Sequence, residues 1–292
     1  IRDWPSLYHL SYCRSFLLRP LRRLLQGRTV LELGAGCGAL TRYLGETAGR
    51  VTALEGSFRR AGITASRCRD LANVTIVNDT IQDLELDEKF DVVTLIGVLE
   101  YARTFGPKVK KPEAALLAAA SSFLKPGGHL LLAIENQLGL KYFAGAREDH
   151  VGMPFFGIHD LYDASTPVTF GRKELVSLLR DAGHVTIEQL IPLPDYKLPT
   201  TILYPACFDG ETPALDVTPF VQSSYKKDNQ KPSEFCFSLE AATAVVARNG
   251  LIQDLCNSLF FVASPQPDNP ACDAAHCVAH YGMLRAPEYA KD

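Results

Sequence analysis

The chain has 292 residues, a length that fits one large domain or two modest ones. Hydrophobic residues make up 47% and charged residues 22%, which is typical of a globular protein. A net charge of −3 argues against nucleic acid as a partner, and no apolar run is long enough to span a bilayer. The eight cysteines form no CxxC pair, so we expect reduced thiols and a cytoplasmic location. We predict no metal site, because the cluster of Cys272, His276, Cys277 and His280 lacks zinc-ligand spacing.

Residues 1–27 are apolar and rich in arginine, and we expect them to form an N-terminal helical cap. The stretch from Leu7 to Gln26 predicts one or two helices that break near Pro20. A basic amphipathic helix can lie on a membrane surface, but we favour packing on the sheet or over a cofactor site. Any membrane association would then be peripheral. Because the chain begins at Ile1, we expect it to be part of a longer protein.

Apolar strand patterns alternate with helical patterns from residue 28 to residue 135, which predicts a doubly wound, mostly parallel α/β sheet. The predicted strands are 28–33, 51–54, 74–77, 90–96 and 129–134. The predicted helices between them are 38–47, 57–70 and 113–124. Their short β-branched and aliphatic runs are typical of strands that are covered on both faces.

The remainder of the predicted domain, which spans residues 28–264, contains two irregular segments. Residues 136–170 form a long connection, of a kind that often carries function, and residues 192–235 are rich in proline and polar residues. Further helices are predicted at 170–181 and 239–248, and further strands at 185–191 and 258–263. Residues 265–292 read as a linker followed, from Val278, by the start of another element that continues beyond this sequence.

The most informative motif follows the first predicted strand. It begins at Glu32 and places glycines at every second position, at Gly34, Gly36 and Gly38. A strand, a glycine-rich turn and a helix start let the backbone approach a nucleotide closely. The fingerprint of dinucleotide-binding proteins places its third small residue one step later, and Glu32 is a further departure from it.

Acidic residues follow the next two strands. Glu55 ends the second strand beside Gly56, 19 residues after Gly36, where a carboxylate can accept hydrogen bonds from both ribose hydroxyls. After the third strand, Asp79 can accept a hydrogen bond from an adenine amine, and the neighbouring Ile81 can pack on the ring. The cofactor candidates are completed by Thr80, by Ile96 and Gly97 at the end of the fourth strand, and by Tyr8 from the N-terminal cap.

With these pieces in order, the sequence resembles the class I S-adenosylmethionine-dependent methyltransferases. The resemblance covers about residues 28–191 and includes the Phe90-Asp91-Val92-Val93 strand and the Pro126-Gly127-Gly128 turn. It implies a seven-stranded sheet whose last two strands are near 185–191 and 258–263. It also implies S-adenosylmethionine as cofactor, with the three glycines at its methionine part, Glu55 at its ribose and Asp79 at its adenine. The glycine spacing and the Pro-Gly-Gly turn argue against a nicotinamide dehydrogenase.

Segments outside this fingerprint support a narrower resemblance. They resemble methyltransferase modules found beside glycosyltransferase or kinase modules in enzymes of bacterial surface polysaccharides such as lipopolysaccharide O-antigen. This implies O-methylation of a sugar hydroxyl, at the non-reducing end of a growing glycan. Where that branch has Gly-Arg-Pro-Phe, this chain has Gly152-Met153-Pro154-Phe155 and lacks the arginine. The segments that carry the resemblance are 8–11, 134–150, 169–175 and 194–199.

A sugar hydroxyl is a poor nucleophile, so the reaction calls for a base near the acceptor. We select His150 as the base, with Glu135 or Asp149 orienting it or the sugar; His159 and Asp160 are further candidates on the same connection. Asp149 and His150 could instead only brace the loop. Two other functions remain open: a methyltransferase for a small molecule or lipid, and a non-catalytic methyltransferase-fold module in a larger glycan-assembly enzyme.

Overall fold

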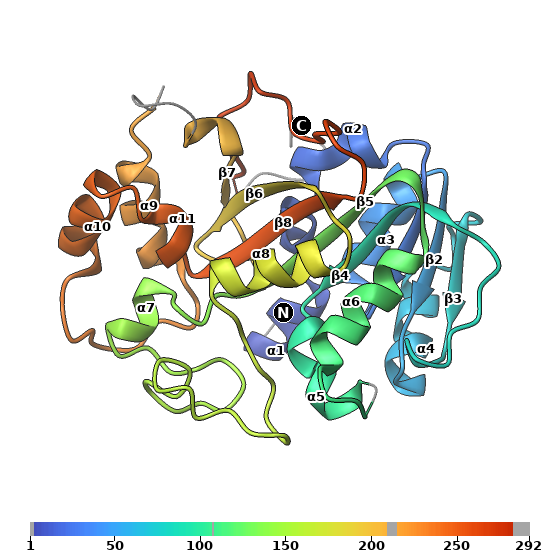
Figure 1. Ribbon diagram of the computed structural model, residues 1–292, viewed down its shortest axis with the longest axis horizontal. Helices are drawn as coiled ribbons and strands as arrows, with labels where there is room; N and C mark the ends of the chain where they lie inside the picture. The colour runs from blue at the N-terminus through green and yellow to red at the C-terminus, as the bar shows by residue number, and fades with distance from the viewer. Residues whose placement is uncertain (1–2, 107, 209–214, 283–292) are drawn as a thin grey trace.

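The computed structural model describes residues 3–106, 108–208 and 215–282, and its centre is one nine-stranded sheet (Figure 1). The strand order is β3-β2-β1-β4-β5-β8-β6-β7-β9. The first five strands are parallel, so their carboxyl ends meet at one edge of the sheet. They are β1 (Thr29–Leu33), β2 (Arg50–Leu54), β3 (Val74–Val77), β4 (Phe90–Ile96) and β5 (Leu124–Glu135).

The remaining four strands extend the sheet beyond β5. Strand β8 (Ser258–Ser264) lies between β5 and β6 (Thr186–Leu193) and is antiparallel to both. Two short strands, β7 (Thr201–Leu203) and β9 (Val278–His280), then pair antiparallel at the far edge. The prediction of strands near 185–191 and 258–263 is therefore confirmed.

The doubly wound fold is confirmed, but the predicted count of seven strands is wrong, because β7 and β9 add two more. They lie in segments 192–235 and 265–292, which we expected to be irregular and linker-like. Each has only three residues, too few for an alternating pattern to stand out in the sequence. The part of the predicted following element from residue 283 onward lies outside the described residues.

Helices cover both faces of the sheet (Figure 1). On one face, α3 (Ala39–Thr47) packs against the 3₁₀ helix η1 (Tyr12–Leu17) and against α4 (Phe58–Arg67). On the other, α6 (Pro112–Ser122) packs against α8 (Arg172–Asp181). The other helices are α1 (Trp4–Leu10), η2 (Arg19–Leu21), α2 (Arg22–Leu25), η3 (Leu99–Tyr101), α5 (Ala102–Phe105), α7 (Leu140–Phe143), η4 (Pro205–Cys207), α9 (Thr218–Ser224), η5 (Tyr225–Lys227), α10 (Leu239–Arg248) and α11 (Ile252–Leu255).

The N-terminal segment folds onto the sheet. It contains two α-helices and two 3₁₀ helices where the sequence predicts one or two helices, and Pro20 lies in the second 3₁₀ turn. Phe16, Leu17 and Leu21 are fully buried, and even the Arg14 side chain is 6% exposed. The part of this segment from Cys13 to Leu25 thus packs on the sheet, whereas α1 has no buried residue and Leu10 at its end is exposed. None of the described helices is long and apolar enough to cross a bilayer.

Candidate functional site

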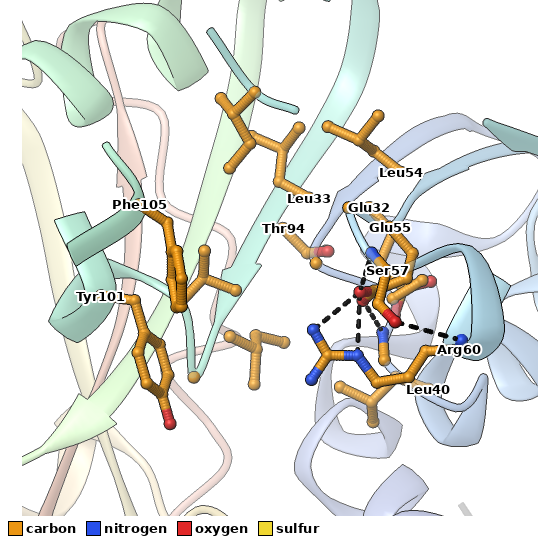
Figure 2. A pocket seen from close by; sticks show the side chains of 18 of the residues that line it. Glu32, Leu33, Leu40, Leu54, Glu55, Ser57, Arg60, Thr94, Tyr101 and Phe105 are labelled. Carbon is orange, nitrogen blue, oxygen red and sulfur yellow. Dashed lines mark hydrogen bonds and ion pairs between the residues drawn. The ribbon is translucent and has the colours of Figure 1, made fainter. Parts of the chain in front are cut away.

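The main pocket has a volume of about 610 Å³ and lies at the carboxyl ends of β1, β2, β3 and β4 (Figure 2). This volume is in the range of sites that bind small molecules and cofactors. All but one of the residues predicted to bind the cofactor line it: Tyr8, Glu32, Gly34, Gly36, Glu55, Gly56, Asp79, Thr80, Ile81, Ile96 and Gly97. In Figure 2, Glu55 and Arg60 form one wall, and Tyr101 and Phe105 lie across from them.

The glycine loop has a conformation that requires glycine. Gly34, Gly36 and Gly38 have φ angles of +82°, +58° and +76°, a region that side chains with a Cβ rarely adopt. A Cβ on Gly34 would also overlap Cγ2 of Val98, so the backbone there lies directly against the loop after β4. Gly38 differs from the prediction: it does not line the pocket but precedes α3 and packs against Thr64 of α4.

Glu55 connects the glycine loop to α4. Its Oε2 accepts a hydrogen bond from the backbone N–H of Gly36 at 2.8 Å. Its Oε1 accepts from the backbone N–H of Ser57 at 2.8 Å and from Nε of Arg60 at 2.9 Å (Figure 2). One lone pair of Oε2 therefore stays available toward the pocket. This arrangement suits the predicted role of binding a ribose hydroxyl.

Glu32 provides a second carboxylate, at the end of β1. Thr41 of α3 donates a hydrogen bond to Oε2 of Glu32 at 2.6 Å. Burial nevertheless raises the pKa of Glu32 to about 7. A buried carboxyl group that lines a pocket is stabilised in its charged form by a cationic ligand group, such as the amino group of a bound amino acid.

The two ends of the pocket are closed by other predicted residues. At β3, Oδ1 of Asp79 accepts from the backbone N–H of Thr80 at 2.8 Å, and the hydroxyl of Thr80 donates to Asp83 at 2.6 Å. Near the N-terminus, Tyr8 lies under the guanidinium of Arg14, whose Cζ is 4.4 Å from the centre of its ring. Arg14 also donates to the carbonyl of Lys197 at 2.9 Å, which joins η1 to the region after β6.

A second group of charged residues lies next to the pocket, at the end of β5. Nε2 of His150 is 3.5 Å from Oε2 of Glu135, and its Nδ1 is 3.3 Å from the hydroxyl of Tyr101. Tyr101 itself lines the pocket. The structure thus joins Glu135 and His150, as predicted, and places one nitrogen of His150 toward the cofactor pocket through Tyr101.

Asp149, the alternative to Glu135 as a partner for His150, lies against other side chains. Its carboxylate lies 3.5 Å from Nζ of Lys141 and 3.6 Å from Nζ of Lys197, and it accepts a hydrogen bond from the hydroxyl of Tyr142. It therefore pairs with two buried lysines and not with His150. Lys197 in turn lies 2.5 Å from Oε1 of Glu135, so this lysine connects Asp149 to the Glu135–His150 pair.

The electrostatics of this group follow from burial and from its many carboxyl groups. Although burial alone would lower it, the hydrogen bond and charge of Glu135 raise the pKa of His150 to about 9. Burial would likewise raise the pKa of Glu135, but Lys197 and His150 hold it well below its usual range. Burial, followed by the charge of Glu135, raises the pKa of Glu100 to about 8. At pH 7 the group therefore holds His150 and Glu100 protonated beside an ionised Glu135.

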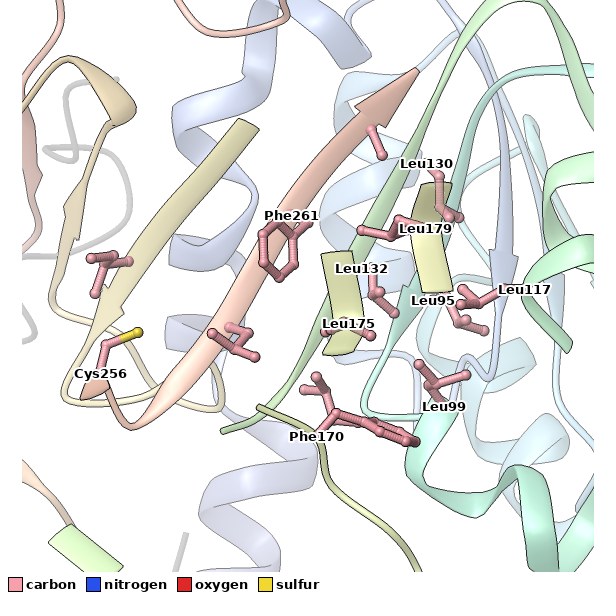
Figure 3. Close-up of a cluster of buried hydrophobic side chains, with 14 of the residues drawn as sticks. Leu95, Leu99, Leu117, Leu130, Leu132, Phe170, Leu175, Leu179, Cys256 and Phe261 are labelled. Atoms are coloured by element: carbon pink, nitrogen blue, oxygen red, sulfur yellow. The ribbon is translucent and has the colours of Figure 1, made fainter. Parts of the chain in front are cut away.

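The ends of the 136–170 connection are fixed to the sheet. The backbone N–H of Gln137 donates to the carbonyl of Phe170 at 3.2 Å, and that of Val168 donates to the carbonyl of Glu100 at 2.9 Å. Phe170 enters the buried cluster formed with Leu175 and Leu179 of α8 and with strand residues such as Leu132 and Phe261 (Figure 3). The connection that carries His150 is therefore held at its first and last residues by these hydrogen bonds and by the packing of Phe170.

Sequence analysis did not select Glu100, Tyr101 or Lys197. Glu100 and Tyr101 come shortly after the fourth strand, near the predicted Gly97. Their position at the end of that strand could have identified them as site residues. Lys197 comes near Glu135 only through long-range folding, and the sequence carries no local sign of that. The other base candidates lie elsewhere: the ring of His159 stacks on Phe155 with centroids 6.0 Å apart, and Asp160 is exposed.

Among the described residues, the metal-type donor atoms that lie within 4.8 Å of one another come from Glu100, Glu135 and His150. The cysteine and histidine residues between 272 and 280 do not form such a group in this part of the chain. Cys272 instead uses its backbone N–H to donate to Glu188, at 3.2 Å.

A parallel sheet with a glycine loop after its first strand and carboxylates after its first three strands defines a class I S-adenosylmethionine-dependent methyltransferase domain. The sequence agrees: residues 8–189 match the family model described as a methyltransferase domain, and the chain belongs to this family. Its cofactor is S-adenosylmethionine. The pocket fits this group, because it has carboxylates for an amino group and a ribose, and because Gly36 in its wall leaves open space where a Cβ would project.

Relatives with curated names match only in part. The chain is 34% identical to the cypemycin N-terminal methyltransferase of a Streptomyces species over 110 residues, which are 38% of this chain and 43% of that protein. It is 46% identical to ribosomal RNA small subunit methyltransferase A of Streptococcus pneumoniae over 57 residues, 20% of each chain. The chain thus matches less than half the length of these relatives.

Solved structures show the same fold. A possible histamine N-methyltransferase of Thermotoga maritima is similar with a TM-score of 0.50 and 17% identity, over 89% of this chain and 92% of that one. An S-adenosylmethionine-dependent methyltransferase of Clostridium acetobutylicum also has a TM-score of 0.50, with 12% identity over 87% of this chain and 90% of that one.

Gly34→Ala is expected to weaken the binding of S-adenosylhomocysteine by at least about tenfold, because left-handed backbone costs a non-glycine residue roughly 1–2 kcal/mol and the methyl group overlaps Val98. Calorimetric titration measures this change. Gly62→Ala is the matched control, since it lies in α4 with no atom within 4 Å of its added Cβ. Equal affinity of the two variants would contradict the role of the Gly34 turn.

Proposed function

We propose that this chain transfers a methyl group from S-adenosylmethionine to a sugar hydroxyl of a bacterial surface polysaccharide, at the non-reducing end of an O-antigen chain. The proposal also includes a cytoplasmic location. It further includes glycosyltransferase or kinase modules beside this domain in a longer protein. The observation that carries it is the Glu135–His150 pair, which contacts the pocket through Tyr101.

The pair suits an oxygen acceptor. A neutral amine attacks with its own lone pair, whereas a hydroxyl must lose its proton as the new bond forms, so a base accelerates the reaction. Nε2 of His150 faces the Glu135 carboxylate at 3.5 Å, which favours the proton on Nε2 in the neutral ring and leaves Nδ1, on the side of Tyr101, as the basic atom. Bound S-adenosylmethionine supplies an electrophilic methyl group. The chain's own contribution is to align the acceptor and to accept its proton.

Two features support a polar acceptor over an apolar small molecule or a lipid. The groups behind Tyr101 are ionisable and largely withdrawn from solvent, and they come from three separate segments: Glu100 after β4, Glu135 and His150 from the end of β5 and its connection, and Lys197 after β6. The segments that resemble polysaccharide-modifying enzymes include residues 134–150 and 194–199, which supply most of this group. A non-catalytic role is disfavoured, because the glycine loop, Glu55 and Asp79 all border an open pocket.

The acceptor is tested on the host's surface glycan. We expect glycan from cells that lack this activity to be lighter by one methyl group at the chain terminus, as measured by mass spectrometry of the released polysaccharide. Complementation with the wild-type chain restores the methyl group. An identical mass with and without the activity would remove the glycan from consideration as the acceptor.

His150→Ala is expected to lower kcat by about 100- to 10,000-fold, the usual contribution of a general base, while S-adenosylhomocysteine binds normally. Turnover and calorimetric titration measure the two effects. His159→Ala is the control, because His159 lies outside the charged group. Full activity of His150→Ala would exclude it as the base. Loss of wild-type activity in EDTA would instead indicate that Glu100, Glu135 and His150 bind a metal ion that the reaction requires.

The pH profile tests the same pair. As a base, His150 must be neutral, so kcat/KM is expected to rise with pH and to level off near pH 9, where its raised pKa lies. Glu135→Gln removes the charge that raises this pKa, so the plateau is expected to begin about 1–3 pH units lower. Circular dichroism confirms folding of the variant. A profile that does not move would show that Glu135 does not control the titrating group.

A further inference from the structure

A second groove, of about 940 Å³, lies beside the cofactor pocket, between the end of α1 and helices α3 and α4. Its charge is unusual for a protein of net charge −3, because four arginines and one aspartate line it. Neighbouring residues of the chain connect the two hollows: His9 and Arg60 line the cofactor pocket, and Leu10 and Arg59 line the groove.

Two of the four arginines hold the groove together. Arg42 pairs with Asp70 at 2.5 Å and with Glu46 at 2.6 Å. Arg67 donates to the carbonyls of His9 and Leu10, at 3.2 and 3.0 Å, and so attaches the end of α1 to α4. These guanidinium groups are committed to the protein itself.

The other two arginines, Arg59 and Arg69, are exposed, and no described residue forms a hydrogen bond or ion pair with either. They lie near opposite ends of α4 along the groove. Guanidinium groups have five donors in a planar fork and bind phosphate oxygens in pairs. Two such groups on one face are suited to phosphates spread over a surface.

The same face exposes large apolar side chains. Phe58, at the first position of α4, is 84% exposed, while Leu10 is 48% and Ile63 38% exposed. Phe58 lies one helical turn before Gly62, which lines the groove, so its side chain borders the same face. Arginines interleaved with exposed apolar residues are typical of surfaces that lie on a membrane interface.

We propose that this face, formed by Leu10, Phe58, Arg59, Ile63 and Arg69, binds the surface of an anionic phospholipid membrane. Arg59 and Arg69 contact lipid phosphates, and Phe58, Leu10 and Ile63 enter the interfacial region. The exposed aliphatic residues Leu10 and Ile63 favour a membrane over RNA, because grooves that bind single-stranded RNA combine phosphate contacts with aromatic stacking. Docking in this way holds the cofactor pocket next to the lipid surface, since α1 borders both hollows.

The test is sedimentation of the protein with vesicles made of equal parts of phosphatidylcholine and phosphatidylglycerol. We expect the wild type to bind them and the Arg59→Gln/Arg69→Gln variant to bind roughly 25-fold more weakly, with about a fivefold loss for each arginine removed. Phe58→Ser is expected to weaken binding as well. Vesicles of phosphatidylcholine alone bind weakly, and added salt reduces binding to the anionic vesicles.

Matched controls lie on α8, on the opposite face of the sheet. Lys173→Gln/Arg180→Gln removes two exposed charges, and Val185→Ser removes an exposed apolar residue just beyond α8; both are expected to bind vesicles like the wild type. S-adenosylhomocysteine binding by every variant confirms the fold and separates this test from that of methyl transfer.

Three outcomes would overturn the proposal. They are a wild type that ignores anionic vesicles, an Arg59→Gln/Arg69→Gln variant that binds them fully, and a wild type that prefers polyuridylate to vesicles and loses that binding in the same variant. The last result would assign the groove to nucleic acid.

Discussion

The ion pair between Glu135 and Lys197 is the interaction on which the charged group beside the cofactor pocket depends. Both side chains are buried, and their charged atoms are 2.5 Å apart. A buried charge without a partner is strongly destabilising, so each of these residues constrains the segment that carries the other. Glu135 ends β5 and Lys197 follows β6, and β8 separates these strands in the sheet. The pair therefore connects the ends of β5 and β6 and fixes the side chains that contact it, which include His150 beside Glu135 and Asp149 beside Lys197.

The cofactor pocket and the charged group use carboxylates in different ways. In the pocket, Glu55 is held by the backbone N–H groups of Gly36 and Ser57 and by Arg60. In the charged group, Glu135 is held by two ionisable side chains, those of Lys197 and His150. Hydrogen bonds from the backbone fix a position, whereas coupled charges also set the protonation state. This difference is consistent with a pocket that binds and a neighbouring group that exchanges a proton.

Features set by local sequence spacing could be predicted, whereas contacts set by tertiary structure could not. The strands, the glycine loop, Glu55 and Asp79 follow from local spacing, and the structure places them around one pocket. Strands β7 and β9 have three residues each and leave no period to detect. Lys197 could not be assigned, because only the antiparallel return of β6 and β8 brings it to Glu135. Of the two carboxylates offered as partners for His150, Asp149 lies beside two lysines instead, and the positions of those lysines are set by tertiary structure.

The raised pKa of His150 has a consequence for folding stability. A histidine that holds its proton more tightly in the folded state than in the unfolded chain stabilises the fold, fully so below its unfolded pKa near 6.5. That contribution is lost as the pH rises through about 9, where the folded protein gives up the proton. The proposed base must lose this same proton before it can accept another. Stability and activity therefore have opposite pH dependences at this one side chain, and the conditions that favour turnover are those in which the fold holds His150 least firmly.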